Sequence, residues 1–220
     1  MKASHSSHGV LPVIRGLIAE MIGPNAAMPI IDVRNGPEEM KFLKRDDLES
    51  LSERGTASPD HVIRIKGRPL VLRKSVWEQG RSAIKEALKD YEIEYKAMFE
   101  RQAPKAAQPK TILPPDPKTI WMEGVGLLGL GANFKSASIA GDLVVQNARV
   151  RSVGEDAGGF YPIGEKDLFD CEYWSLEQAK LGKGKAPPFQ GKVVMVTGGS
   201  GTIGFETAKA FSSLGAQCFL

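Results

Sequence analysis

The chain has 220 residues, of which 42% are hydrophobic, and its 29 basic and 26 acidic residues leave a formal net charge of +3. This length and composition predict a globular protein of one or two domains, and the small net charge with scattered basic residues argues against a nucleic-acid partner. No apolar run reaches membrane-spanning length and no signal-peptide core follows Met1, so we expect a cytoplasmic protein without a membrane partner.

The predicted elements alternate between helices and short strands, which favours the α/β class. In chain order we expect a helix at 10–21, a strand at 30–33, one or two helices at 37–51, strands at 62–66 and 70–72, the longest helix at 76–101, a strand at 119–122, a helix at 135–150 and a short helix within 167–181. The Ala/Pro/Lys/Gln-rich stretch up to Pro117, the break at Gly154–Gly159 and the linker at 182–190 are predicted loops, and the Lys180–Lys185 cluster is expected to be solvated.

The histidines and cysteines predict no metal site. Cys171 and Cys218 have neither metal-ligand spacing nor a disulfide framework, which suits a reducing compartment. His5 and His8 have a spacing that brings side chains together on a helix, but the polar start of the chain around them is a poor helix former. We therefore assign no metal-binding residue to this chain.

A basic segment follows Asp60-His61. If residues 62–66 form a strand, alternation places Arg64, Lys66 and Arg68 on one face, where they could meet a sugar phosphate. The alternative is a turn capped by Asp60, with the basic side chains in solvent. We favour the second interpretation, because charged side chains are usually solvated.

A glycine-rich stretch follows the predicted strand at 119–122. Its spacing, Gly124-x-Gly126-x-x-Gly129, matches that of dinucleotide-binding turns. Two interpretations stay open: a nucleotide-binding turn, and a tight strand-to-helix turn without a ligand. We favour the second, because isolated matches to this spacing are common.

The strongest motif begins at Gly191. Val193–Val196 is a short apolar run that predicts a strand covered on both faces, and Gly199-x-Gly201-x-x-Gly204 follows it. In such a turn the first glycine permits the tight bend, the second lets a pyrophosphate approach the backbone, and the third lets the helix pack closely on the strand. The N–H groups at the start of the helix then face the phosphates.

The residues after this turn continue the pattern. Residues 205–214 predict a helix, and residues 217–220 predict a second strand, so the glycine spacing has the context that makes it specific. The alternative is a glycine-rich loop without a ligand. Four apolar residues are expected on or near one face of the helix, namely Ile203, Ala208, Phe211 and Leu214.

This segment resembles the opening of the short-chain dehydrogenase/reductase family. The family motif Thr-Gly-x-x-x-Gly-x-Gly is met by Thr197, Gly198 and Gly204, with Thr202 at the middle glycine position. The spacing of the extended branch, Thr-Gly-x-x-Gly-x-x-Gly, is met in full with Gly201, so both branches stay open. The resemblance implies NAD or NADP as cofactor, with six residues lining its phosphates: Gly198, Ser200, Gly201, Thr202, Ile203 and Gly204.

The residues that carry out hydride transfer in this family have no counterpart in the chain. Members use a Tyr-x-x-x-Lys pair and a serine downstream of the turn, and none of the four tyrosines here is followed by lysine four residues later. The residue that selects NAD or NADP follows the second strand, about 20 residues past the glycines. We therefore assign no catalytic residue and expect no turnover by these 220 residues alone.

Three further segments resemble bifunctional class II aldolase/short-chain dehydrogenase proteins. They are Gly55–Leu72, Gly124–Leu128 with the helix after it, and Leu168–Leu181, which in that family joins the two regions directly before the Thr-Gly turn. The resemblance runs in the same order from Leu11 to Leu220. It implies the later part of a class II aldolase-like α/β region at 1–165, an interdomain linker at 166–190, and the truncated start of a Rossmann domain, a doubly wound parallel sheet, at 191–220.

The resemblance implies part of an NAD(P)-dependent oxidoreductase acting on sugars or sugar phosphates, with assembly into a homo-oligomer as a further expectation. The family's aldolase histidines and glutamate, which bind zinc or another divalent metal, would lie upstream of this chain. The competing interpretations are a non-catalytic module for partner binding or oligomerisation, and the remnant of a truncated gene. An isolated strand–helix–strand start leaves an apolar sheet edge, which argues against a complete module.

Overall fold

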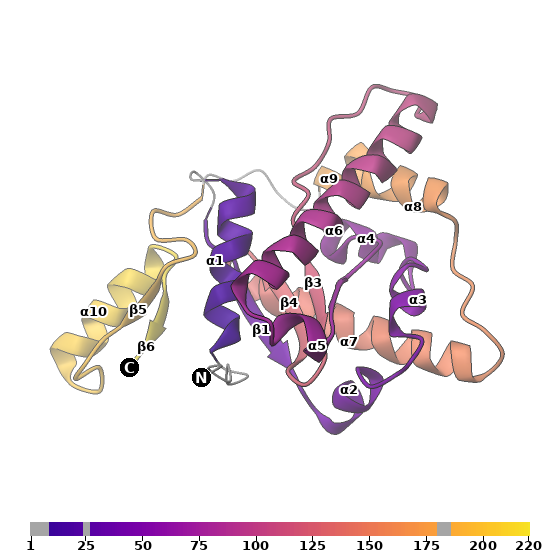
Figure 1. The fold of residues 1–220 in the computed structure, drawn as a ribbon. Helices are drawn as coiled ribbons and strands as arrows, with labels where there is room; N and C mark the ends of the chain where they lie inside the picture. Colours follow the sequence, from indigo (N-terminus) through magenta and orange to yellow (C-terminus); the bar gives the residue numbers. More distant parts are fainter. Residues whose placement is uncertain (1–8, 24–26, 180–185) are drawn as a thin grey trace.

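The computed structural model describes residues 9–23, 27–179 and 186–220. They form an α/β structure with helices on both faces of a four-stranded sheet (Figure 1), so the predicted α/β class is confirmed. None of the described helices combines the length and the apolar character needed to cross a membrane. In chain order the elements are α1 (Val10–Ile22), β1 (Ile30–Arg34), α2 (Pro37–Phe42), α3 (Leu48–Ser52), the 3₁₀ turn η1 (Pro59–His61), α4 (Val62–Ile65), β2 (Leu70–Leu72), α5 (Lys74–Trp77), α6 (Arg81–Gln102), the 3₁₀ turn η2 (Ala103–Lys105), β3 (Thr119–Met122), β4 (Gly126–Gly131), α7 (Phe134–Asp156), α8 (Glu165–Glu172), α9 (Ser175–Ala179), β5 (Val193–Met195), α10 (Thr202–Ser213) and β6 (Gln217–Phe219).

The main sheet has the strand order β1-β4-β3-β2. β4 pairs antiparallel with β1 and with β3, whereas β2 pairs parallel with β3. β3 and β4 form a hairpin, and Gly124 in its turn has a φ angle of 79°, which favours glycine. The sheet is therefore mixed, with β1 at one edge and the short strand β2 at the other.

Strand β4 is rich in glycine where α7 packs directly against its backbone. A Cβ atom at Gly129 would lie 2.2 Å from the backbone N of Gly141, and one at Gly131 would lie 2.3 Å from the backbone N of Ala137. No side chain fits at either strand position without moving the helix. These glycines therefore set the distance between α7 and the sheet.

Alternate residues of the central strands face two helix layers. On one face, Ile120 and Leu128 belong to the larger apolar core, which α1, α5 and α6 cover. On the other face, Trp121 and Leu127 pack with residues of α2, α3 and α7, and the ring of Trp121 meets that of Phe42 edge-to-face, with centroids 4.9 Å apart. Because both faces are covered, all four residues of β3 are buried, and burial does not alternate along the strand.

The predicted strand at residues 62–66 is wrong. These residues form the short helix α4, which follows the 3₁₀ turn that begins at Pro59. Val62 and Ile65 are both buried and lie three residues apart, so their burial needs helical spacing rather than alternation. The β-branched residues favour a strand locally, and tertiary packing overrides that preference. Lys66 ends the helix, with its N–H donating to the carbonyl of Val62.

The single helix predicted at 76–101 is two helices. A turn between α5 and α6 ends at Gly80, whose φ of 96° breaks the helical backbone. α7 is longer than α6, with 23 residues against 22, because it continues through the break predicted at Gly154. A glycine inside a helix lowers its stability without ending it when tertiary contacts hold both sides.

The strand-to-helix turn favoured at Gly124–Gly129 is also wrong. The segment forms the β3–β4 hairpin and most of strand β4, and the helix starts only at Phe134. Asn133 and Ser136 form a capping box there, in which each side chain bonds the backbone N–H of the other residue. The glycines of this segment serve the hairpin turn and the packing of α7.

The C-terminal segment forms a strand–helix–strand unit beside α1 (Figure 1, yellow). β5 pairs parallel with β6, with Val193 opposite Gln217, and α10 connects the two strands. The predicted order of strand, glycine turn, helix and second strand is confirmed. Arg15 of α1 links this unit to the main body, because its guanidinium donates to the carbonyl oxygens of Pro29, at 2.7 Å, and of Gly191.

Apolar side chains of this unit are exposed. Met195 of β5 is 79% exposed and Ile203 of α10 is 86% exposed. The prediction that β5 is covered on both faces is therefore wrong for the described residues, because Val193 at the start of the same strand is also exposed. Of the four residues predicted on or near one face of α10, Ala208 is buried, Phe211 is half-buried, and Ile203 and Leu214 are exposed.

Arg151 of α7 is a charged side chain in the interior and is 1% exposed. Its guanidinium donates to the carbonyl oxygens of Leu51, at 2.7 Å, and of Gly55. The guanidinium carbon also lies 5.0 Å from the centroid of the Trp121 ring, a cation–π arrangement. α7 thus holds the end of α3 and the turn after it through backbone carbonyl groups.

Replacing Arg151 by methionine is expected to lower the free energy of unfolding by about 2–4 kcal/mol, because the buried carbonyl groups of Leu51 and Gly55 lose their donor. Urea denaturation followed by circular dichroism measures this change. Arg149→Met is the matched control, since Arg149 is exposed on the same helix, and its effect should stay below about 0.5 kcal/mol. Equal losses in the two variants would contradict the role of Arg151.

Candidate functional site

The first candidate site is the glycine turn between β5 and α10. Gly198 has a φ of 72°, and its carbonyl accepts the N–H of Gly201 at 3.0 Å, which closes the turn. A Cβ atom at Gly204 would lie 2.3 Å from that same carbonyl oxygen. α10 can therefore start this close to the backbone of the glycine turn only because residue 204 is glycine.

The six residues predicted to line the cofactor phosphates all lie in this turn and in the first turn of α10. A Cβ atom at Gly201 would approach only the carbonyl of Gly198, at 3.4 Å, so the outer side of the turn is open. No side chain caps α10 at Gly201, so N–H groups of its first turn are available to a ligand. Gly204 is half-buried, and five are exposed: Gly198, Ser200, Gly201, Thr202 and Ile203.

The second candidate site is a cavity of about 960 Å³ beside α6. Its walls come from the α3–α4 connection, the corner between α4 and β2, one side of α6, and residues 160–172. Figure 1 shows these elements on the opposite side of the molecule from the C-terminal unit. The volume is that of a small-molecule site. The apolar part of the wall includes Val62, Leu70, Met98, Leu168 and Phe169.

Lys66 lies at a polar part of this wall and has an unusual backbone. Among the described residues it alone has a positive φ without being glycine, with φ 60° and ψ 169°. Such a conformation costs on the order of 1–3 kcal/mol, and residues of this kind cluster at functional sites. Lys66 is 5% exposed; its Nζ donates to the carbonyl of Pro114 at 2.6 Å and lies 3.4 Å from the centroid of the Tyr95 ring.

Tyr95 links Lys66 to a buried carboxyl group. The Tyr95 hydroxyl donates to Glu172 Oε1 at 2.8 Å and shares a 2.9 Å hydrogen bond with the Tyr173 hydroxyl. The Leu113 N–H donates to that second hydroxyl at 3.2 Å. We call Lys66, Tyr95, Glu172 and Tyr173 the Lys66 cluster; all four residues are buried.

Burial shifts the protonation equilibria of this cluster toward the neutral forms. Desolvation lowers the pKa of Lys66 to about 8, against the opposing effect of the charges on Glu172 and Asp116. Desolvation likewise raises the pKa of Glu172, although the charge of Lys66 and the Tyr95 hydrogen bond lower it. The Lys66 amine therefore loses its proton more readily than that of an exposed lysine, and the Glu172 carboxyl group retains its proton more readily than that of an exposed glutamate.

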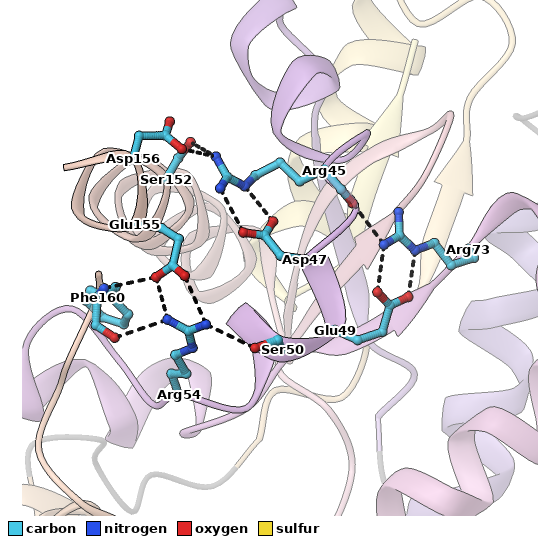
Figure 2. Close-up of polar contacts among 10 residues, drawn as sticks. All are labelled: Arg45, Asp47, Glu49, Ser50, Arg54, Arg73, Ser152, Glu155, Asp156 and Phe160. Carbon is cyan, nitrogen blue, oxygen red and sulfur yellow. Dashed lines mark hydrogen bonds and ion pairs between the residues drawn. The ribbon is translucent and has the colours of Figure 1, made fainter. Parts of the chain in front are cut away.

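An ion-pair network holds the cavity wall near α3 (Figure 2). Arg54 lies between the Glu155 carboxylate and the Ser50 hydroxyl, which is 3.0 Å away. Glu155 also accepts the N–H of Phe160 at 3.0 Å, which joins the end of α7 to the segment that continues along the cavity. The hydrogen bond from Arg54 is the main cause of the lowered pKa of Glu155. Arg54 is therefore engaged within the wall.

Two further arginines extend this network (Figure 2). Arg45 pairs with Asp47 at 2.7 Å and with Asp156 at 2.8 Å, which connects α7 to the segment before α3. Arg73 pairs with Glu49 at 2.6 Å and donates to the carbonyl of Arg45 at 2.9 Å. Each of these partly exposed pairs stabilises weakly, and together they fix the position of α3.

The other arginines on the cavity wall also face carboxylates. Arg68 pairs with Glu53 at 3.2 Å and Arg101 pairs with Glu165 at 2.8 Å. Both also approach Glu94, at 3.8 and 3.4 Å. A phosphate group in the cavity would have to displace a carboxylate from one of these guanidinium groups, whereas an uncharged ligand would not.

The basic face considered for Arg64, Lys66 and Arg68 does not form, because it depended on a strand at 62–66. The favoured alternative, with all three side chains in solvent, is wrong for Lys66, which is buried. The Lys66 cluster was missed in the sequence because its members come from the end of α4, from α6 and from the α8–α9 junction, with no local spacing to mark them. Tyr95 and Glu172, for example, are 77 residues apart.

The divalent metal implied by the aldolase resemblance finds no ligand set in the described part of the chain. No group of three His, Cys, Asp or Glu side chains there is arranged to hold a metal ion. His5, His8 and the Lys180–Lys185 cluster lie outside the described residues.

Known protein sequences are similar to both the main body of this chain and its C-terminal unit. A profile of the family described as "Aldolase class II, second domain" matches residues 5–181. The uncharacterized oxidoreductase YuxG of Bacillus subtilis (strain 168) is 28% identical over 216 residues, which cover 95% of this chain. The chain spans 30% of the length of that relative. No solved structure matches the chain.

Lys66→Met is expected to lower the free energy of unfolding by about 1–3 kcal/mol, because the Pro114 carbonyl group would lose its donor and the buried Glu172 carboxyl group would lose a nearby positive charge. The double variant Lys66→Met/Glu172→Gln should recover at least about half of that loss. Thermal unfolding of both variants and of the exposed control Lys89→Met measures these changes. Strictly additive losses would show that the two side chains do not interact.

Proposed function

Because the chain belongs to the class II aldolase second-domain family, we propose that it is part of an NAD(P)-dependent oxidoreductase in which an aldolase-like region precedes a short-chain dehydrogenase domain. Residues 1–165 would belong to the aldolase-like region, 166–190 to the linker and 191–220 to the start of a Rossmann domain. The proposed substrates are sugars or sugar phosphates.

The observation that carries this proposal is the parallel β5–α10–β6 unit with its glycine turn. In doubly wound sheets a dinucleotide lies across the carboxyl ends of the parallel strands, with its pyrophosphate at the start of the first helix. Gly198 and Gly204 allow the turn and the close approach of α10, while the exposed hydroxyl groups of Ser200 and Thr202 can donate to phosphate oxygens. The nicotinamide would supply the hydride acceptor, and the residues described here would bind and orient the phosphates.

The named relative supports the redox part of the proposal. YuxG is described as an oxidoreductase, and its similarity covers 95% of this chain, so the match includes the glycine turn as well as the family-matched region. One continuous similarity over both parts is expected if they belong to one polypeptide.

The exposed apolar residues of the C-terminal unit suggest a second candidate function. Met195 and Ile203 would be covered by further strands and helices in a complete dehydrogenase domain. In a non-catalytic module, a partner protein or another copy of the chain would cover them instead. The two candidates differ in whether the unit binds a nicotinamide nucleotide.

The complete protein that contains this sequence is expected to bind NADH or NADPH, measured by the change in nucleotide fluorescence on titration. Ser200→Glu should weaken that binding by about tenfold or more, because a carboxylate would face the pyrophosphate at the helix start. Ser200→Gln has nearly the same size without the charge and should weaken binding much less.

Two outcomes would overturn this assignment. If neither nucleotide binds, the turn is not a cofactor site, and self-association measured by light scattering would then favour the non-catalytic module. If the Glu and Gln variants bind a nucleotide equally well, the phosphates lie elsewhere.

A further inference from the structure

Tyr161 presents an exposed aromatic ring at the cavity beside α6. The residue lines this cavity of about 960 Å³, yet it is 85% exposed. A Cβ atom at Gly159 would lie 2.3 Å from Cε2 of the Tyr161 ring, and Gly159 has a φ of 134°, which favours glycine. The ring therefore lies against the backbone of Gly159, while most of its surface remains open to a ligand.

The segment that carries Tyr161 is fixed on both sides of the ring. On one side, the buried Phe160 donates its N–H to the Glu155 carboxylate at 3.0 Å (Figure 2). On the other side, Glu165 at the start of α8 pairs with Arg101 of α6 at 2.8 Å. The Tyr161 ring is thus held at a defined place on the cavity wall.

The charged groups of the wall form pairs that keep hydrogen-bonding capacity. Arg68 pairs with Glu53 at 3.2 Å, and both it and Arg101 approach Glu94. The side chains in the Arg68–Glu53 and Arg101–Glu165 pairs are each at least 42% exposed. A guanidinium group has five N–H donors and a carboxylate accepts through two oxygens, so these pairs can still bond to a ligand.

Three classes of ligand would meet these pairs differently. A phosphate would compete with a carboxylate for a guanidinium group that is already paired. A wholly apolar ligand would remove water from the charged pairs without replacing its hydrogen bonds, which is costly. A hydroxyl group can donate to a carboxylate and accept from a guanidinium group, so a polyhydroxy ligand replaces this water without separating a pair.

The rest of the wall suits the ring of a sugar. Apolar side chains line the cavity together with the charged pairs, namely Val62, Leu70, Met98, Leu168 and Phe169. A sugar ring carries hydroxyl groups at its edge and C–H groups on its faces. The C–H groups can pack on apolar side chains and on the negative face of an aromatic ring.

We propose that this cavity binds uncharged mono- or disaccharides in their ring form, with a sugar face on the Tyr161 ring and hydroxyl groups on the arginine–carboxylate pairs. The inference rests on the sugar substrates of the proposed function and names an uncharged class among them. Nucleotide binding at residues 198–204 is a separate matter, because the cavity and the C-terminal unit lie on opposite sides of the molecule (Figure 1).

Protection of Tyr161 from nitration tests the proposal. The complete protein that contains this sequence is treated with tetranitromethane, with or without D-glucose, D-galactose, D-xylose or maltose, and nitration of Tyr161 is measured by peptide mass spectrometry. The other three tyrosines of the chain are buried or half-buried. At high millimolar concentration, at least one sugar should slow nitration of Tyr161 by about threefold or more, as two-thirds occupancy requires. If none of the four protects Tyr161, the proposal is overturned.

Two matched solutes test the class of ligand. Glycerol has hydroxyl groups but no ring, and it should not protect Tyr161; protection equal to that by the sugars overturns binding of a ring. Glucose 6-phosphate should need at least about tenfold more solute than glucose for the same protection, because its phosphate competes with paired carboxylates. Protection by the phosphate ester at the same or lower concentration overturns the assignment of an uncharged ligand.

A nucleotide titration of the same samples separates this inference from the dehydrogenase assignment. Protection of Tyr161 without binding of NADH or NADPH supports the sugar site and contradicts the cofactor site. Nucleotide binding without protection by any sugar overturns the sugar site alone.

Substitution of Tyr161 tests the part played by its ring. Tyr161→Ala should weaken binding of the protecting sugar about three- to tenfold in saturation-transfer difference NMR, because the stacking contact is lost. Tyr161→Phe keeps the ring and should bind within about twofold of the unchanged protein. Trp174→Ala is the matched control, since Trp174 is an exposed aromatic residue outside the cavity wall. An unchanged affinity in Tyr161→Ala, folded by circular dichroism, would overturn the stacking role.

Discussion

The packing of α7 directly on the backbone of β4 is the constraint on which the rest of the structure depends. Gly129 and Gly131 remove the side chains that would otherwise hold the helix away from the sheet. Because the helix is this close, its far end reaches the α3 region, where Arg151 holds backbone carbonyl groups and Glu155 holds Arg54 and the N–H of Phe160. The cavity wall is thus positioned by contacts that begin at two glycines in a strand.

The Lys66 cluster combines two features that oppose stability, a strained backbone and a desolvated amine. Structures keep such features only where the surrounding packing enforces them. Here the enforcing contacts come from α6 through Tyr95, from the segment after η2 through Pro114, and from α8 through Glu172. The position of Lys66 therefore depends on contacts from three elements that are far apart in the sequence.

The sequence predicted those parts of the fold that local patterns determine. Periodicity located α1, β1 and the central strand β3, and turn chemistry located the β5–α10–β6 unit, because glycine spacing, helix and strand follow one another within 30 residues. The strand predicted at 62–66 was wrong. The β-branched residues there form one helical turn instead, because Val62 and Ile65 are both buried. The glycine turn could be predicted as a candidate site, whereas the Lys66 cluster could not, since its members meet only in three dimensions.

Arg15 of α1 links the C-terminal unit to the main body through hydrogen bonds to backbone atoms. The Arg15 guanidinium donates to the main-chain oxygens of Pro29 and Gly191. The contact therefore depends on where the backbone lies at these two residues and not on their side chains. At Gly191 even a methyl group is excluded, because a Cβ atom would lie 2.5 Å from the carbonyl oxygen of Met28. The orientation of the unit therefore depends on the backbone path at Pro29 and Gly191, and a residue inserted directly before Gly191 would displace the unit from Arg15.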